Sequence, residues 1–255
     1  MTFIPLSVSN AHLVHLFFEW AAIATGMQLY RQQRQQYGLG SMLQTGSYAV
    51  MIGCIAGAAM GNKLVFWLEF PHLWSQYSID MTAWMSGQSI VGGLLGGLIG
   101  IELTKKMYGL TQSTGDQFVL PLVAGTIVGR IGCFFAGLHD GTYGNPTGLP
   151  WGIDFGDGIS RHPTQLYDML FAALFGGALL MSRKRWVGKP GLLFKFYLSG
   201  YLAWRFAIDA IKPVPYDYGF GLSGIQCICL LALLIYLPLV IKQSQALEHH
   251  AIPQT

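Results

Sequence analysis

The chain has 255 residues, of which 52% are hydrophobic and only 11% are charged. In a soluble domain about a quarter of all residues are typically charged, so this composition argues against a soluble enzyme and indicates a membrane protein. The formal net charge is only +3, and we expect no nucleic-acid partner.

Hydropathy predicts seven membrane-spanning helices, because the apolar runs approach the ~20 residues that a helix needs to cross the hydrocarbon core. The predicted spans cover residues 11–30, 45–66, 88–103, 117–137, 164–182, 190–211 and 222–241. We expect one all-α, polytopic integral-membrane domain over residues 1–255. Its predicted outer loops lie at about 70–87, 138–163 and 212–221, and a disordered tail is predicted at about 243–255.

Lys and Arg residues are concentrated in alternate connections. The connections after spans one, three, five and seven hold Arg31, Arg34, Lys105, Lys106, Arg183, Lys184, Arg185, Lys189 and Lys242. The other connections hold only Arg161 and Lys212. Because basic connections stay in the cytoplasm, the sequence predicts a periplasmic N-terminus and a cytoplasmic C-terminus.

The first predicted span carries His15 and Glu19, which are four residues apart and so share one helix face. Two interpretations remain open. Glu19 is either paired inside the protein to hold helices together, or a general base faces a lipid cavity here. In the second case the base is Glu19, or His15 held by Glu19, with His15 at the substrate, and burial makes the carboxylate more basic.

Glycines recur in the second and third spans. Gly53, Gly57 and Gly61 are four residues apart, which is a small-residue stripe typical of close helix contact. The third span, 88–103, is also rich in glycine, and we expect its glycines to allow another helix or a lipid chain to approach.

Arg130 lies deep in the fourth span, between Gly129 and Gly132. An ionisable side chain in a membrane is costly and is a functional candidate by default. It is either paired with a carboxylate on another helix or bound to a phosphate, which the guanidinium fork fits. We favour phosphate binding, with the two glycines giving a lipid headgroup room to approach.

The loop that follows carries His139 and Asp140 and ends at Arg161 and His162, immediately before the fifth span. A helix N-terminus at the outer surface attracts anions, so we expect Arg161 and His162 at a substrate site. Gln165 and Asp168 share one face of the helix that begins there. We place Gln165 at the substrate, whereas Asp168 fits a cap and interface role.

The sixth span places Tyr201, Arg205 and Asp209 on one stripe at intervals of four residues. Arg205 either forms a salt bridge with Asp209 within the helix or belongs to the site, and we favour the site. Gln226, at the start of the seventh span, is expected to reach the same cavity.

The four cysteines all lie in apolar segments, and their spacing is not that of zinc ligands. We interpret Cys54, Cys133, Cys227 and Cys229 as small packing residues. The sequence therefore predicts no metal site and no cofactor.

Two motifs resemble the signature of the bacterial phosphatidylglycerol–prolipoprotein diacylglyceryl transferases. They are Gly129-Arg130-Ile131-Gly132 with Phe134, and Arg161-His162-Pro163-Thr164-Gln165-Leu166-Tyr167-Asp168. The resemblance implies a seven-helix enzyme of the bacterial inner membrane that moves a diacylglyceryl group from phosphatidylglycerol to a cysteine thiol of a lipoprotein precursor, releasing glycerol phosphate. Tyr201 and Arg205 resemble the tyrosine–arginine pair on the sixth helix of this family, which makes Arg130 and Arg205 the expected catalytic arginines.

The chain departs from the pattern of this family at three polar positions. Val91, Cys133 and Leu138 stand where the family has a histidine, an asparagine and an acidic residue. His139 and Asp140 are candidate replacements. The candidates for the base that deprotonates the acceptor thiol are His139, His162 and Glu19.

Two other functions stay open because of these departures. One is a transferase that uses the same phospholipid but a different acceptor. The other is a non-catalytic lipid-binding protein built on the same helices. In each case we expect a monomer.

Overall fold

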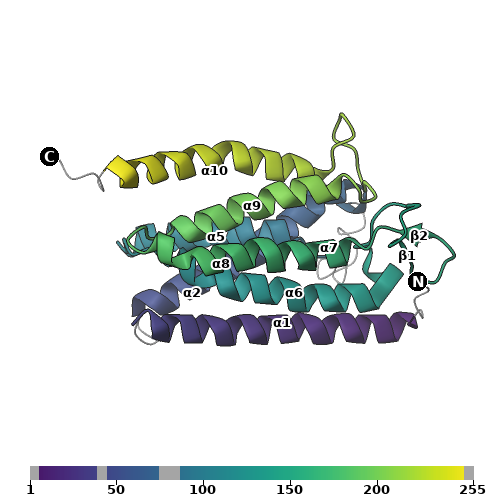
Figure 1. The fold of residues 1–255 in the computed structure, drawn as a ribbon, viewed down its shortest axis with the longest axis horizontal. Helices are drawn as coiled ribbons and strands as arrows, with labels where there is room; N and C mark the ends of the chain where they lie inside the picture. The colour runs from purple at the N-terminus through teal and green to yellow at the C-terminus, as the bar shows by residue number, and fades with distance from the viewer. Residues whose placement is uncertain (1–5, 39–44, 75–86, 250–255) are drawn as a thin grey trace. The chain divides into compact units, whose positions relative to one another are not determined.

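The computed structural model of the protein describes residues 6–38, 45–74 and 87–249. These residues are mostly helical (Figure 1). The α-helices are α1 (Val8–Gln36), α2 (Thr45–Glu69), α5 (Ile90–Met107), α6 (Val119–Ala136), α7 (Thr164–Phe171), α8 (Gly177–Met181), α9 (Leu192–Asp209) and α10 (Gly224–His249). The short elements are the 3-10 turns η1 (Pro71–Leu73), η2 (Gly115–Phe118), η3 (Gly137–Asp140) and η5 (Ser182–Trp186), the π turn η4 (Ala172–Gly176), and an antiparallel hairpin of β1 (Ile153–Asp154) and β2 (Ser160–Arg161).

The described residues belong to two compact units, and the single membrane domain expected from the sequence stays a prediction. The first unit comprises residues 1–38, 113–213 and 236–255, and the second comprises residues 39–112 and 214–235. Helix α10 begins in the second unit and ends in the first.

Each of the seven predicted spans coincides with a helix of the described residues, the fifth being α7, η4 and α8 in succession. Among the described residues, four helical stretches are long and apolar enough to cross a membrane: Gly46–Glu69, Gly115–Asp140, Thr164–Trp186 and Gly224–Gln245. The protein is therefore a multi-pass membrane protein. The number of crossings and the orientation stay predictions.

Two predicted loop regions have different outcomes. Most of the outer loop predicted at 70–87 lies outside the described residues. The tail predicted to be disordered from residue 243 is helical as far as His249, the last described residue. Gln243 explains this order in part, because it accepts a hydrogen bond from Lys195 Nζ and donates one to the carbonyl of Pro190 at 3.2 Å.

In the first unit, α1 lies antiparallel to α6 (Figure 1). Tyr30, near the end of α1, stacks on Phe118 at the start of α6, with 4.5 Å between ring centroids. Near the other end of the pair, a Cβ atom at Gly132 would lie 2.5 Å from Cβ of Phe18. This glycine is therefore what allows the two helices to approach closely.

The core of the first unit joins α6 to α9 through Val119, Val123, Leu193 and Tyr197. Asp116, just before α6, accepts hydrogen bonds from the backbone N–H groups of the α9 start, at 2.7 Å from Gly191 and 3.0 Å from Phe194. The start of α6 and the start of α9 therefore lie at the same end of this unit. The end of α6, the start of α7 and the end of α9 meet at the opposite end.

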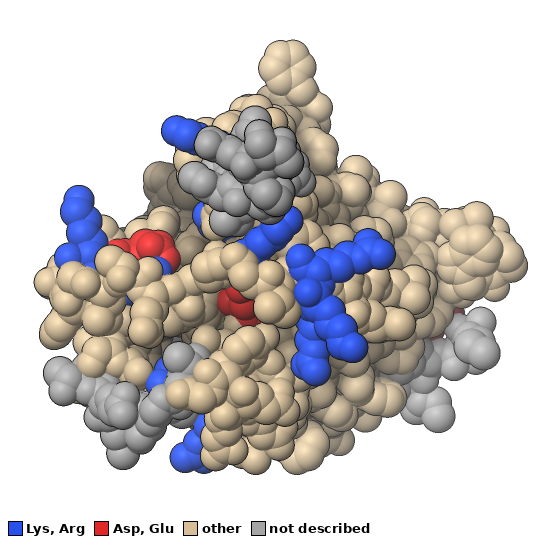
Figure 2. Space-filling model, turned by 60° about the vertical axis from the view of Figure 1, so that its left-hand side comes forward, with Lys and Arg blue, Asp and Glu red and all other residues tan. Residues whose placement is uncertain are grey.

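The end of the first unit that holds the start of α9 is basic. The turn η5 leads into α9 and contributes the exposed side chains of Arg183, Lys184 and Arg185. Figure 2 looks toward this side of the molecule, where Lys and Arg side chains stand out on the surface.

In the second unit, α2 and α5 pack through the predicted glycine stripe. A Cβ atom at Gly57 would lie 2.3 Å from the carbonyl oxygen of Gly96, and one at Gly61 would lie 2.3 Å from that of Gly92. Such distances leave no room for any side chain, so the glycines allow backbone-to-backbone contact. The predicted packing role of the stripe in α2 is confirmed.

We predict that Gly96→Ala destabilises the protein by about 1–2 kcal/mol, because the new methyl group would overpack the α2–α5 contact. Gly93→Ala is the matched control, since a Cβ atom there would have no neighbour closer than 3.9 Å. Thermal unfolding in detergent measures both variants. Equal melting temperatures for the two variants would contradict the packing role of Gly96.

Candidate functional site

A buried ion pair joins the end of α6 to the start of α7. Arg130 is 7% exposed, and its NH2 atom lies 2.9 Å from Oδ2 of Asp168. The other carboxylate oxygen of Asp168 accepts a hydrogen bond from Trp204 Nε1 of α9 at 2.8 Å. The pair thus connects three helices. Sequence analysis left a carboxylate partner for Arg130 open, and Asp168 is that partner.

A small cavity adjoins this ion pair. It is lined by Thr126, Arg130, Asp168, Phe171, Ala172, Tyr197, Tyr201 and Trp204. Its volume of about 10 Å³ is close to that of a single water molecule, so a lipid headgroup could enter only if the walls move. The π turn η4 begins at Ala172 in the wall, and π turns are frequent at functional sites. The cavity brings together Arg130 and Tyr201, both predicted site residues.

Arg205 forms an ion pair within α9, with its NH2 atom 2.9 Å from Oδ1 of Asp209, which is the alternative that the sequence analysis did not favour. The pairing leaves donors free on both arginines. Arg130 Nε and Arg205 NH1 are buried and have no hydrogen-bond partner among the described residues. A buried donor without a partner is costly, which makes these two atoms candidate ligand contacts.

Lys212 is the site residue that sequence analysis missed. It follows α9, is only 7% exposed, and interacts electrostatically with Arg130, Arg205, Asp168 and Asp209. Burial and the two arginines lower the pKa of Lys212 to about 7. With Lys212 protonated, the cluster holds three basic and two acidic groups, so one positive charge is in excess. We call these five residues the basic cluster.

The structure does not bring Arg161 into the basic cluster. Its NH1 atom lies 2.6 Å from Oδ1 of Asp157, and its guanidinium lies 5.1 Å from the ring centre of Tyr143. The hydrogen bond from Arg161 lowers the pKa of Asp157. The expected convergence of Arg161 with the other two arginines is therefore replaced by convergence of Lys212 with them. His162, next in sequence, lies with Nδ1 3.3 Å from the Tyr167 hydroxyl.

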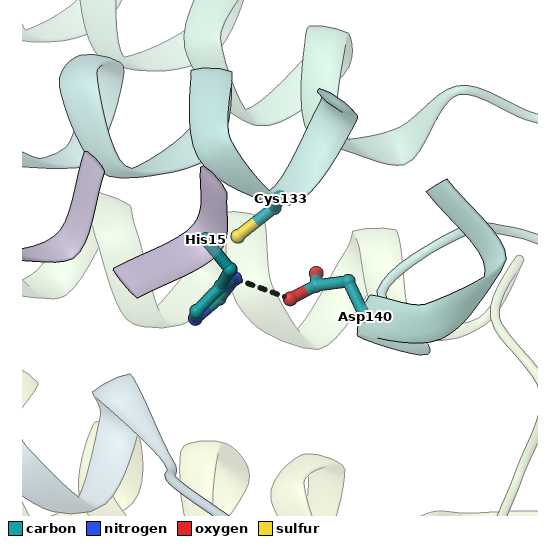
Figure 3. Close-up of side chains that lie close together, drawn as sticks. All are labelled: His15, Cys133 and Asp140. Atoms are coloured by element: carbon teal, nitrogen blue, oxygen red, sulfur yellow. Dashed lines mark ion pairs between the residues drawn. The ribbon is translucent and has the colours of Figure 1, made fainter. Parts of the chain in front are cut away.

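A second polar cluster lies where α1 meets η3 (Figure 3). His15 Nδ1 is 2.7 Å from Oδ1 of Asp140, so His15 contacts Asp140 rather than Glu19. Cys133 completes the group, and its Sγ lies 3.7 Å from Arg130 NH1. His139 is exposed on η3, and Glu19 is partly buried on α1. The conjecture that Asp140 supplies a missing polar group is consistent with this placement.

The remaining predicted site residues lie in three different places: one is buried without a polar partner, two face α1, and one caps α10. Gln165 is 0% exposed, and neither of its amide atoms has a hydrogen-bond partner among the described residues. Gly129 and Gly132 face α1, since their Cβ positions lie nearest to Ala22 and Phe18. In the second unit, Gln226 accepts a hydrogen bond from the backbone N–H of Ser223 at 3.0 Å and so caps α10.

The fold and the site define a multi-pass membrane protein with a buried, positively charged cluster near the ends of three helices. A family model described as prolipoprotein diacylglyceryl transferase matches residues 14–242. The phosphatidylglycerol–prolipoprotein diacylglyceryl transferase of Nitrosomonas europaea is 31% identical over 79% of this chain and 72% of its own length. The enzyme of the same name from Nitratidesulfovibrio vulgaris strain DP4 is 31% identical over 86% of this chain and 82% of its own length. The one from Polynucleobacter asymbioticus is 32% identical over 77% of this chain and 76% of its own length. The chain belongs to the prolipoprotein diacylglyceryl transferase family.

We predict that the free energy of unfolding rises by about 2 kcal/mol between about pH 7 and pH 9 because of Lys212. The pKa of Lys212 is about 7 in the folded protein, below its ordinary 10.5, so folding releases its proton across this window. Stability therefore increases as the pH rises. Lys212→Met should remove this rise, whereas Lys184→Met, at an exposed position, should keep it. Thermal unfolding in detergent at the two pH values measures the effect, and an unchanged rise in Lys212→Met would contradict the assignment.

Proposed function

We propose that this protein transfers a diacylglyceryl group from phosphatidylglycerol to the cysteine thiol of a lipoprotein precursor and releases glycerol phosphate. Membership of the family gives the reaction class. The observation that carries the proposal for this chain is the pair of buried guanidinium nitrogens, Arg130 Nε and Arg205 NH1, that have no hydrogen-bond partner among the described residues. A buried cation without a full complement of anions attracts an anionic ligand, and the phosphodiester of phosphatidylglycerol is such a ligand.

The basic cluster suits the charge that develops during the reaction. The acceptor sulfur attacks the glycerol carbon that carries the phosphodiester oxygen, and the carbon–oxygen bond breaks with its electron pair on that oxygen. The phosphate group therefore gains negative charge in the transition state. Donors that are already oriented toward such charge stabilise it strongly, and Arg130 Nε and Arg205 NH1 are the available donors.

The two carboxylates have a positioning role in this proposal. Asp168 and Asp209 each hold one nitrogen of a guanidinium and leave another nitrogen without a partner. Each arginine is thereby fixed in orientation without being fully neutralised. A fixed donor loses little entropy when the phosphate arrives, which is the benefit of preorganisation.

The position of the exposed basic residues in the first unit supports a site in the outer leaflet of the membrane. The exposed basic turn η5 and the start of α9 lie at one end, and the basic cluster lies toward the other. Since basic segments stay in the cytoplasm, the cluster end faces the periplasm. We propose seven crossings with a periplasmic N-terminus and a cytoplasmic C-terminus, in the bacterial inner membrane, as a monomer.

Other predicted residues are proposed around the substrate. The unpartnered buried amide of Gln165 is suited to bind headgroup oxygens, and Tyr201 lines the cavity beside Arg130. Arg161 and His162 are proposed at the rim, on the loop that precedes α7. Glu19 and His139 stay proposed as acid–base residues.

We predict that Arg130→Ala and Arg205→Ala each lower turnover by at least about 100-fold, because each removes a donor to the developing phosphate charge. Arg183→Ala is the matched control, since this exposed arginine lies on η5. Purified protein is incubated with phosphatidylglycerol and a cysteine-containing lipoprotein peptide, and the thioether product is measured. Membrane insertion is checked by the yield of folded protein.

Two outcomes would contradict the proposal. Full turnover in either arginine variant would remove that residue from the site. Failure of the wild-type chain to form a thioether, or to support growth of cells depleted of their own transferase, would exclude the transfer reaction. Phosphatidylglycerol binding without turnover would then favour the non-catalytic alternative.

A further inference from the structure

Two hydrogen bonds in series lead from an exposed tryptophan to the imidazole of His162. Trp151 Nε1 donates to the hydroxyl of Tyr167 at 2.8 Å. The same hydroxyl lies 3.3 Å from Nδ1 of His162. Trp151 and His162 belong to the segment between η3 and α7, and Tyr167 belongs to α7 itself. The three side chains therefore form one connected group at the start of this helix.

The chemistry of the three groups sets the direction of these bonds. An indole N–H can only donate, so the phenol oxygen of Tyr167 accepts from Trp151. The phenol proton then needs an acceptor of its own. In the part of the chain that the structure describes, Nδ1 of His162 is the only further hydrogen-bond partner of this hydroxyl. Nδ1 accepts the bond, and the proton of the neutral imidazole is therefore on Nε2.

The opposite order of protons is less favourable. If Nδ1 of His162 carried the proton, the imidazole and the indole of Trp151 would both donate to the one phenol oxygen of Tyr167. The phenol proton would then have no acceptor among the described residues, and the contribution of one hydrogen bond would be lost. Successive hydrogen bonds that run in one direction also strengthen each other. Both effects favour the order from indole to phenol to imidazole.

We propose that Trp151 and Tyr167 are positioning residues that hold the His162 proton on Nε2, and that this N–H donates a hydrogen bond to a headgroup oxygen of the bound phospholipid. The inference rests on the proposed function, because it names the contact that His162 makes with the lipid substrate of that reaction. It also removes His162 from the candidate bases. A nitrogen that already carries a proton cannot accept another from the acceptor thiol.

The backbone holds His162 in place on both sides. Its N–H donates to the carbonyl of Asn145 at 3.1 Å, and its carbonyl accepts from the N–H groups of Gly144 and Thr164, each at 2.9 Å. A Cβ atom at Gly144 would lie 2.6 Å from Cβ of His162, so the two segments are in close contact. The imidazole thus projects from a fixed point, which favours a donor that is oriented before the substrate binds.

The same segment connects His162 to the basic cluster. Asn145 donates its backbone N–H to the carbonyl of Ile211 at 2.8 Å and its side-chain amide to the carbonyl of Lys212 at 3.3 Å. Lys212 is a member of the basic cluster. Asp168, another member, comes directly after the tyrosine of the hydrogen-bonded group. His162 therefore lies at the edge of the region in which the phosphodiester is proposed to bind.

The ring of His162 is open to a ligand. The residue is partly exposed, and its Nε2 has no hydrogen-bond partner among the described residues. The lipid headgroup offers acceptor oxygens on both its phosphate and its hydroxyl groups, so an N–H donor is the complementary group. An imidazole fixed in this tautomer presents that donor.

Nitrogen NMR of histidine reads the tautomer directly and does not depend on turnover. Purified protein in detergent carries isotope-labelled histidine, and the His162 signals are those that are absent from His162→Gln. We expect a protonated Nε2 and an unprotonated Nδ1. Tyr167→Phe and Trp151→Phe each remove one hydrogen bond of the series and should give a mixture of both tautomers. Tyr37→Phe and Trp20→Phe, at exposed positions in or next to α1, are the matched controls and should keep the wild-type signals.

Steady-state kinetics of thioether formation test the contact with the lipid. His162→Ala should raise KM for phosphatidylglycerol about 5–10-fold with a smaller change in kcat, because a hydrogen bond to the bound headgroup is lost. Loss of a base would lower kcat instead. His162→Gln should restore most of the affinity, since a glutamine amide N–H can occupy the place of Nε2–H. His162→Asn should not, because asparagine reaches only as far as Nδ1.

The outcomes separate this inference from the proposed function. An unprotonated Nε2 in the wild-type chain, or the wild-type tautomer in both Tyr167→Phe and Trp151→Phe, would overturn the positioning role. A large loss of kcat at unchanged KM in His162→Ala would return His162 to the candidate bases and overturn the donor role, as would rescue by asparagine but not by glutamine. A wild-type chain that forms no thioether would contradict the transferase. The tautomer and the phosphatidylglycerol affinity of the same variants would still decide this inference.

Discussion

The contact on which the functional end depends is the buried ion pair between Arg130 and Asp168. Removing two charges from water costs several kcal/mol per ion, and the structure offsets that cost with a 2.9 Å contact and a hydrogen bond from Trp204. Arg130 belongs to α6, Asp168 to α7 and Trp204 to α9, so satisfying the charges also fixes these three helices against one another. The position of the cavity follows from this constraint.

A stable ion pair alone would need no further charge nearby. Arg205, Asp209 and Lys212 nevertheless lie close enough to interact with it, and the cations outnumber the carboxylates. Holding an extra positive charge in a poorly solvated place destabilises the protein unless an anion binds there. The depressed pKa of Lys212 is the signature of that cost, and anion binding would relieve it. We interpret the instability as part of the function.

The sequence and the structure agree best where the interaction is local. Helix positions follow from runs of apolar residues, the Arg205–Asp209 pair follows from a spacing of four, and the glycine stripe of α2 follows from the same helical period. Each of these features depends only on residues within one helix. The resemblance added Arg130 and Arg205 as a pair, which no local pattern could relate.

Sequence alone thus determined that the chain crosses a membrane and which arginines to suspect, because hydropathy and helical periodicity are properties of neighbouring residues. Tertiary structure decided their partners. Asp168 rather than another carboxylate meets Arg130, Lys212 rather than Arg161 joins the basic cluster, and Asp140 rather than Glu19 reaches His15. These contacts join segments that are far apart in the sequence, by more than a hundred residues for His15 and Asp140, and only the packing of helices brings such segments together.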